Sequence, residues 1–171
     1  MSSLKAYIGL SGGYLFDEEL VTHFHNKGLY RAVFYGIMEA GMTGKYVHDA
    51  LPRNSPEAIV RSSTFIENKV GPSLPQMVLL HGTADISMPP SQSATFVDAL
   101  RLAGANAKLT YYKGKSHTDA FIEDPIKGGS DKLLQDLLEI IFGEDHKHEQ
   151  VCIPGLLPHW WVNLARMFMP F

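Results

Sequence analysis

Among the residues whose side chains exchange protons readily, one aspartate and one histidine lie in loops directly after apolar segments. Asp85 lies in the loop HGTAD, four residues after His81, and His117 lies in the loop KGKSHTD, five residues after Tyr112. A carboxylate that accepts a hydrogen bond from one ring nitrogen of a histidine fixes the imidazole tautomer, and the imidazole then acts as a base and afterwards as an acid. The pair is therefore predicted to be the acid and base of a catalytic triad.

Two alternatives to this assignment stay open. The first is that His117 is an ordinary histidine of a surface loop. The second is that Asp119, which is closer to His117 in sequence than Asp85, is the acid. A residue only two positions away is poorly placed to orient the ring of His117. We therefore expect Asp85 to be the acid.

The segments before these two loops have the pattern of neighbouring strands. Residues 77–81, MVLLH, form a continuous apolar run, which is typical of a strand buried on both faces. Residues 107–112 indicate a second strand, and residues 91–103 have the spacing of a helix between the two. Strands joined in this way form a parallel sheet with crossover helices, and the loops at the carboxyl ends of its strands lie at one edge. The spacing thus predicts that the two loops meet.

The rest of the chain predicts an α/β protein. Further elements are expected as a strand over 4–10, a helical region over 17–39 divided at Gly28, a loop over 41–54, a helical stretch that starts at Ser55-Pro56 and extends over 58–66, and a helix over 131–142.

A serine suited to complete a triad is harder to find. Residues 9–13, GLSGG, fit the G-x-S-x-G pattern of a nucleophile elbow and follow a predicted strand. An elbow also needs a second oxyanion donor from an earlier strand–helix loop, and only ten residues precede Ser11. We therefore expect that Ser11 is not the nucleophile.

Composition excludes several other classes of protein. The chain has 171 residues, of which 45% are hydrophobic and 19% charged, with a formal net charge of −3, so it is expected to be globular and not to bind nucleic acid. A single cysteine, Cys152, excludes an internal disulfide. No apolar run approaches the roughly 18 residues of a membrane span. His146, His148 and Glu149 lie in a charged linker, and we expect no metal site there.

Several segments resemble a known family. Residues 74–129, which include the HGTAD and SHTD loops, resemble the plant isoprenylcysteine α-carbonyl methylesterases, in the lipase-like branch of the α/β-hydrolases. The segments AYIGLSGGY, THFHNKGLYR and LARMFMPF are similar to the same family. The resemblance implies hydrolysis of prenylated cysteine methyl esters, or similar apolar esters, at endoplasmic reticulum and Golgi membranes. It also implies no organic cofactor and no metal, and it matches Asp85 and His117 to the catalytic acid and base.

The resemblance covers only the C-terminal part of that fold. The family's nucleophile elbow and oxyanion loop lie upstream of the segment similar to AYIGLSGGY. We therefore expect residues 1–143 to be the C-terminal part of an α/β-hydrolase domain, with residues 14–75 as a helical cap-like insertion, followed by a linker over 144–155. The chain is expected to be a truncated isoform or partial gene product, inactive alone. Alternatives are a non-catalytic interaction or lipid-binding fragment, or a related esterase with another substrate.

Residues 156–171 are expected to form an amphipathic helix. Its apolar stripe comprises Leu157, Trp160, Trp161, Leu164, Met167 and Phe168. Such a stripe docks onto the body of the protein or lies against a membrane surface. Because the opposite face is narrow and weakly basic, we favour docking, with peripheral membrane contact as the alternative.

Overall fold

The computed structural model of the chain describes residues 4–43, 50–143, 152 and 154–168. The chain divides into two compact units. Unit 1 consists of residues 1–7, 12–78 and 91–109, and unit 2 consists of residues 8–11, 79–90 and 110–171. Each unit therefore contains part of every strand, and the two candidate residues of the sequence analysis both belong to unit 2.

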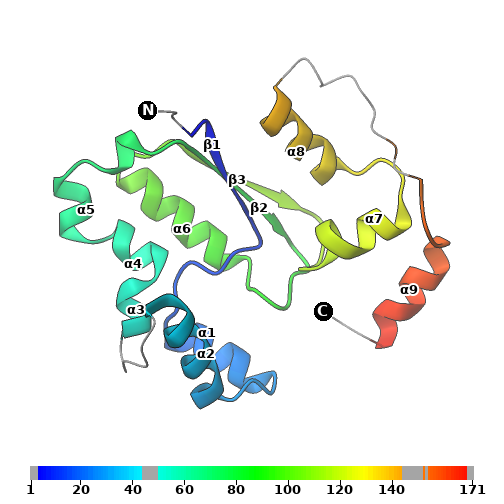
Figure 1. Cartoon of the computed structure of the whole chain (residues 1–171), viewed down its shortest axis with the longest axis horizontal. Coiled ribbons are helices and arrows are strands. Elements are labelled where there is room, and N and C mark those ends of the chain that lie inside the picture. The colour runs from blue at the N-terminus through cyan, green and yellow to red at the C-terminus, as the bar shows by residue number, and fades with distance from the viewer. Residues whose placement is uncertain (1–3, 44–49, 144–151, 153, 169–171) are drawn as a thin grey trace. The chain divides into compact units, whose positions relative to one another are not determined.

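The described strands form one parallel sheet in the order β1-β2-β3 (Figure 1). They are β1 (Ala6–Leu10), β2 (Gln76–Gly82) and β3 (Ala107–Tyr112). In the central strand β2, every residue after Gln76 is buried, as the apolar run predicted. The helix α6 (Ser91–Leu102) connects β2 to β3, so the expected α/β class with parallel strands and a crossover helix is confirmed.

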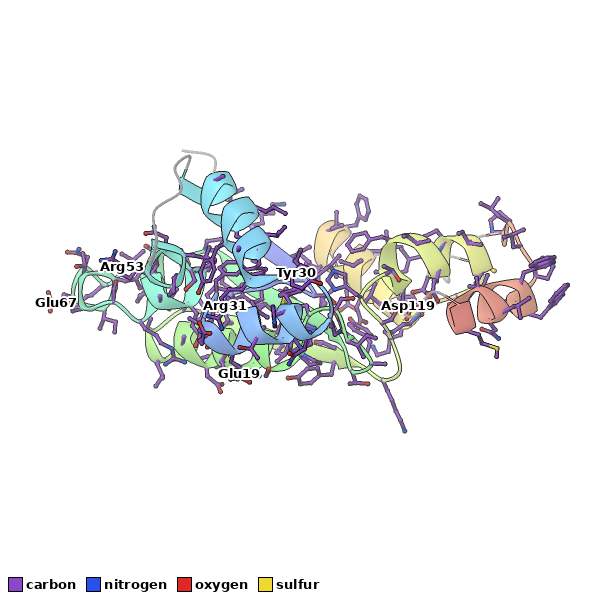
Figure 2. The ribbon with its side chains drawn as sticks, turned by 90° about the horizontal axis from the view of Figure 1, so that it is seen from below. Glu19, Tyr30, Arg31, Arg53, Glu67 and Asp119 are labelled. Atoms are coloured by element: carbon purple, nitrogen blue, oxygen red, sulfur yellow. The ribbon has the colours of Figure 1, made fainter. Side chains whose placement is uncertain are left out.

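Unit 1 contains the helices that follow β1. These are α1 (Glu18–Asn26), α2 (Arg31–Thr43), α3 (Ala50–Asn54), α4 (Pro56–Val60) and α5 (Ser63–Glu67), then a 3₁₀ turn η1 (Gly71–Ser73) and α6. Gly28, with φ of 93°, separates α1 from α2 as predicted. An ion pair between Arg31 and Glu18 links the two helices across this turn, where Figure 2 labels Tyr30 and Arg31.

Two sequence expectations in this region were wrong. The predicted loop over 41–54 includes the last turn of α2 and the helix α3, because Leu51 is completely buried and packs α3 into the unit. The helix expected over 58–66 is two short helices. The interruption lies at Ser62, whose hydroxyl accepts the N–H of Phe65 at 3.2 Å and so caps α5.

A buried carboxylate joins α4 to α6 within unit 1. Glu57 accepts hydrogen bonds of 2.8 Å from Nε of Arg61 and from Oγ1 of Thr95, which satisfy both of its oxygens. The Tyr14 ring stacks on Phe96 of α6 with centroids 4.3 Å apart. The fully buried apolar side chains of this unit are Leu20, Val21, Leu51, Val97 and Leu100.

Unit 2 contains the segments after β3. They are a π-helical turn η2 (Asp119–Glu123), α7 (Asp124–Lys127), α8 (Lys132–Phe142) and α9 (His159–Phe168). The start of α8 is capped by Asp131, whose Oδ1 accepts the N–H of Leu133 at 2.9 Å. Residues 144–151 and 153 of the predicted linker lie outside the described residues.

The face by which α9 packs differs from the expectation. Trp160 and Trp161 are 60% and 50% exposed, and Leu157, Leu164 and Met167 of the predicted stripe are exposed too, whereas Val162 is buried. The preceding segment is bound to α7 through the N–H of Leu156, which donates to the carbonyl of Ile126 at 2.8 Å. Within the described residues, no helix is both long enough and apolar enough to cross a bilayer.

Candidate active site

Asp85 lies in the turn that follows β2, and its carboxylate is fixed by the main chain of that turn. Its Oδ1 accepts the N–H of Ser87 at 3.0 Å and the N–H of Met88 at 2.8 Å. The side chain has no exposed surface. A buried carboxylate held by two main-chain donors cannot rotate freely, so the direction of its second oxygen is set by the turn.

The structure brings His117 to that second oxygen. Nδ1 of His117 lies 2.9 Å from Oδ2 of Asp85, although the residues are 32 positions apart in sequence. Because an ionised carboxylate only accepts hydrogen bonds, Nδ1 carries the proton and Nε2 is the basic nitrogen. The His117 side chain is 39% exposed, so the imidazole is within reach of a reacting group.

A second histidine, which the sequence analysis did not assign to the site, contacts the same carboxylate. Nε2 of His81, in β2, lies 3.3 Å from Oδ2 of Asp85 and 3.1 Å from the carbonyl oxygen of Met88. The His81 side chain is completely buried. The signal in the sequence was a histidine at the end of a buried strand, four residues before the aspartate.

The surroundings of Asp85 keep it ionised. Burial acts to raise the pKa of Asp85, but donation from His81, from the main chain of Met88 and from His117 outweighs it and lowers the pKa from 3.8 to about 2. The carboxylate is thus charged at neutral pH, the state in which a carboxylate can stabilise a neighbouring imidazolium.

The loops that carry Asp85 and His117 are bound to each other by their main chains. The N–H of Ala84 donates to the carbonyl of Lys115 at 3.0 Å, and the N–H of Gly114 donates to Oγ1 of Thr83 at 2.9 Å. A Cβ atom at Gly82 would lie 2.1 Å from the carbonyl oxygen of Lys115. Only glycine therefore permits this approach of the loops.

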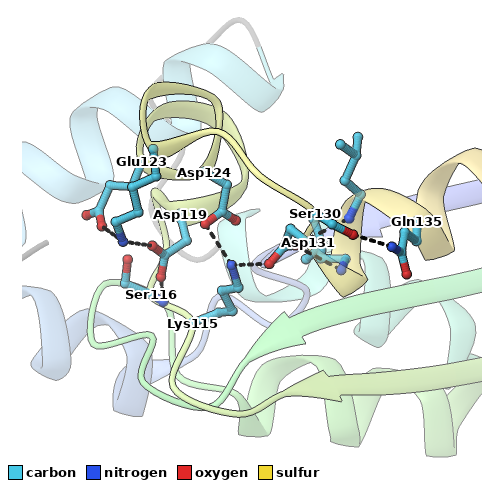
Figure 3. Close-up of polar contacts among 11 residues, drawn as sticks. Lys115, Ser116, Asp119, Glu123, Asp124, Ser130, Asp131 and Gln135 are labelled. Carbon is cyan, nitrogen blue, oxygen red and sulfur yellow. Dashed lines mark hydrogen bonds and ion pairs between the residues drawn. The ribbon is translucent and has the colours of Figure 1, made fainter. Parts of the chain in front are cut away.

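Lys115 also anchors the histidine loop through its side chain (Figure 3). Its ammonium lies 2.7 Å from Oδ1 of Asp124 and 2.5 Å from Oδ2 of Asp131, the residue that caps α8. The carboxylates outweigh the effect of burial and raise the pKa of Lys115. The loop between β3 and η2 is thus fixed to the starts of both α7 and α8.

Asp119, the alternative acid, has a different environment. It is buried, its Oδ2 accepts the N–H of Ser116 at 2.5 Å, and its Oδ1 lies 4.0 Å from Nζ of Lys127 (Figure 3). The carboxylate hydrogen-bonded to Nδ1 of His117 is that of Asp85.

Ser11 has one local feature of a nucleophile elbow, an unusual backbone conformation, but it lacks the other, a helix that begins directly after it. Its φ of 46° is unusual for a residue other than glycine. Its N–H donates to the carbonyl of Leu80 at 2.9 Å, so it continues the β1–β2 pairing. An elbow passes from strand to helix in one sharp turn, whereas residues 12–17 here are not helical and α1 begins only at Glu18.

The candidates for metal binding do not lie in the described part of the chain. His146, His148 and Glu149 are outside it. Among the residues that the structure does describe, no group of three or more His, Cys, Asp or Glu side chains is arranged to hold a metal ion.

Comparison with known proteins relates this geometry to a family. Residues 30–133, which include Asp85 and His117, match the prolyl oligopeptidase family. A probable isoprenylcysteine α-carbonyl methylesterase of Oryza sativa subsp. japonica is 46% identical over 180 residues, which cover 100% of this chain and 40% of the relative. The isoprenylcysteine α-carbonyl methylesterase of Arabidopsis thaliana is 42% identical over 176 residues, with 100% and 39% covered. The predicted resemblance is thereby confirmed, and the chain spans about two fifths of the length of these relatives.

Solved structures similar to this one include Thermogutta terrifontis esterase 2. Its propionate-bound form has a TM-score of 0.47 and 18% identity, covering 88% of this chain and 45% of that one. The native form gives 0.45 and 19%, covering 85% and 45%. On the match over residues 30–133, the chain belongs to the prolyl oligopeptidase family.

Proposed function

We propose that this chain supplies the acid and base of a carboxyl-ester hydrolase. The observation that carries the proposal is the 2.9 Å hydrogen bond between Nδ1 of His117 and a fully buried carboxylate oxygen of Asp85. In the reaction, Nε2 of His117 takes the proton of a serine hydroxyl as the hydroxyl attacks the ester carbonyl. His117 then returns that proton to the departing alcohol, and Asp85 stabilises the imidazolium between the two steps. Water hydrolyses the acyl-enzyme by the same route.

The proposed substrate is a methyl ester of a prenylated cysteine. This part of the proposal is supported by the names of the plant relatives, which are isoprenylcysteine α-carbonyl methylesterases. The first product to leave would be methanol, and the second would be the free carboxylate of the prenylcysteine. The site of action would be endoplasmic reticulum and Golgi membranes, as the family resemblance implies.

The proposal further holds that Ser11 is not the nucleophile and that these 171 residues alone do not hydrolyse the ester. It is supported by the path of the main chain, since a non-helical segment of six residues separates Ser11 from α1. An elbow requires the helix at once, because the helix N-terminus contributes to the oxyanion site.

Two sets of proteins test the roles of Asp85 and His117 separately from the proposal that the isolated chain has no turnover. The first is a chimera in which this chain replaces the matching segment of the rice relative. Hydrolysis of a prenylcysteine methyl ester is expected, with kcat reduced by about 10⁴-fold or more in His117→Ala and Asp85→Asn and unchanged in Ser11→Ala. A folded, active chimera that is insensitive to His117→Ala would refute the roles of the pair.

The second set is the isolated chain and its variants. The isolated chain is expected to show no more turnover of the prenylcysteine methyl ester or a p-nitrophenyl ester than its His117→Ala variant. Turnover that Ser11→Ala abolishes would instead make Ser11 the nucleophile and contradict that part of the proposal.

A second candidate function, lipid binding without catalysis, is favoured by α9. Trp160 and Trp161 stack with centroids 4.7 Å apart and are both at least half exposed, a composition suited to a membrane interface. Co-sedimentation of the isolated chain with phosphatidylcholine vesicles, lost in Trp160→Ser/Trp161→Ser, would support peripheral contact. Equal sedimentation of the variant and the parent chain would exclude α9 as the contact.

A further inference from the structure

The buried histidine of β2 does not belong to the acid–base pair, but it contacts the acid directly. We infer that His81 is a positioning residue, whose Nε2–H holds Oδ2 of Asp85 ionised and directed at Nδ1 of His117. This inference deepens the proposed function and rests on it for its catalytic meaning. The structural part of the inference stands on the geometry alone.

The location of the proton on His81 follows from its neighbours. Nε2 lies 3.1 Å from the carbonyl oxygen of Met88 and 3.3 Å from Oδ2 of Asp85. A carbonyl oxygen and an ionised carboxylate both accept and do not donate, so Nε2 must carry a proton to interact favourably with either. That proton is shared between the two acceptors, and it links the carboxylate to the main chain of its own turn.

The carboxylate of Asp85 then accepts from four donors. Oδ1 accepts from the N–H groups of Ser87 and Met88, and Oδ2 accepts from His81 and His117. Three of these donors lie within residues 81–88, so they hold the carboxylate independently of the loop that carries His117. Rotation of the carboxylate would break all three, which means that His117 meets an acceptor already oriented for it.

Because His81 and Asp85 are both buried, the ionisation of Asp85 depends on the hydrogen-bond donor of His81. The side chains of His81 and Asp85 both have no exposed surface, so bulk water cannot easily replace a missing donor on Oδ2. Without the Nε2–H group, the buried carboxylate of Asp85 would have one hydrogen-bond donor fewer to offset the effect of burial, which disfavours its charged form. Its proton affinity would rise, and a protonated Asp85 no longer stabilises an imidazolium.

The test uses nuclear magnetic resonance on the intact chain. In the wild type, ¹⁵N spectra at neutral pH are expected to show that Nε2 of His81 carries a proton, because both groups that face it are acceptors. The ¹³C signal of the Asp85 carboxyl is expected not to titrate above about pH 3, which follows from its depressed pKa. An unprotonated Nε2 in the wild type would overturn the inference without any variant being made.

Substitutions then separate positioning from packing. His81→Phe keeps the ring and removes the donor, and it should raise the proton affinity of the Asp85 carboxyl at least tenfold, which is about one pH unit in its titration midpoint. His81→Gln places an amide N–H near the position of Nε2, and it should restore the midpoint to within about threefold of the wild type. His159→Phe, on the exposed surface of α9, is the matched control and should leave the midpoint unchanged.

The two readouts distinguish a positioning role from a structural one. If His81 only fills space, His81→Phe changes the free energy of unfolding but leaves the Asp85 titration of the folded protein where it was, and the inference fails. If His81→Phe does not fold, the protonation of Nε2 in the wild type still decides. None of these measurements needs turnover, so an active chimera that is insensitive to His117→Ala would refute the proposed function and leave this result intact.

Discussion

The main-chain N–H of Ala84 donates a 3.0 Å hydrogen bond to the carbonyl of Lys115. Ala84 directly precedes Asp85, and Lys115 lies two residues before His117. The loops that carry the acid and the base are therefore joined by their own backbones next to the two functional residues. Because peptide groups are rigid, this bond helps to fix the separation of Asp85 and His117 independently of the side chains around them.

The close approach of these loops predicts a strong effect of Gly82→Ala. The new Cβ atom would lie 2.1 Å from the carbonyl oxygen of Lys115, so one of the two loops must move. We expect the free energy of unfolding to fall by about 1–3 kcal/mol, as for other overpacked sites, and the His117–Asp85 hydrogen bond to lengthen. Urea denaturation followed by circular dichroism measures the first effect.

A matched control for this substitution is Gly36→Ala in α2, where a Cβ atom meets nothing within 4 Å. Alanine is the better helix former, so this variant should be more stable by about 0.5–1 kcal/mol. A Gly82→Ala variant as stable as the wild type would contradict the predicted clash.

The ion pairs of Lys115 predict that Lys115→Met destabilises the chain. The substitution leaves the carboxylates of Asp124 and Asp131 without their shared cation in a partly buried place, at a cost of about 1–3 kcal/mol. Lys115→Arg keeps the charge and should recover much of this loss. The same urea experiment measures both variants.

Lys132→Met is the comparison for an exposed pair. Lys132 lies 3.0 Å from Asp136, but its side chain is 74% exposed, so its loss should change stability by less than about 0.5 kcal/mol. Equal losses for Lys115→Met and Lys132→Met would show that burial does not strengthen the Lys115 network.

The depressed pKa of Asp85 predicts a specific dependence of stability on pH. Its value is about 2 in the folded protein against 3.8 for the free side chain, so between these pH values the unfolded state binds more protons. The stabilisation by Asp85 is thus complete above about pH 4 and is lost as the pH falls through about 2, a change of about 2 kcal/mol. The difference in unfolding free energy between the wild type and Asp85→Asn should shrink accordingly, and a difference independent of pH over this range would refute the assignment.

The left-handed backbone of Ser11 predicts that glycine is better tolerated there than alanine. At a φ of 46° a side chain costs roughly 1–2 kcal/mol, which glycine avoids, although glycine also loses more entropy on folding. Ser11→Gly should therefore be more stable than Ser11→Ala by about 1 kcal/mol, measured by thermal unfolding. The reverse order would mean that the serine conformation is not strained.

Local sequence determined the secondary structure that carries the site. The strand β3 has the predicted bounds 107–112, and α6 ends one residue before its predicted limit, because apolar periodicity and flanking turn residues act over short distances. The positions of Asp85 and His117 after neighbouring parallel strands followed from the same pattern. Helix α3 was missed because the burial of Leu51, rather than local propensity, stabilises it.

Tertiary structure alone decided which groups surround the pair. Nothing in the spacing of residues indicated that His81 donates to the acid, that Lys115 binds the starts of α7 and α8, or that α9 buries Val162 and exposes its tryptophans. The sequence by itself determined the strands and the loops that bring Asp85 and His117 to one edge, since those depend on each segment's own pattern. The donors, cations and packing faces depend on which distant segments come into contact, and a hydrogen bond or an ion pair exists only at that contact.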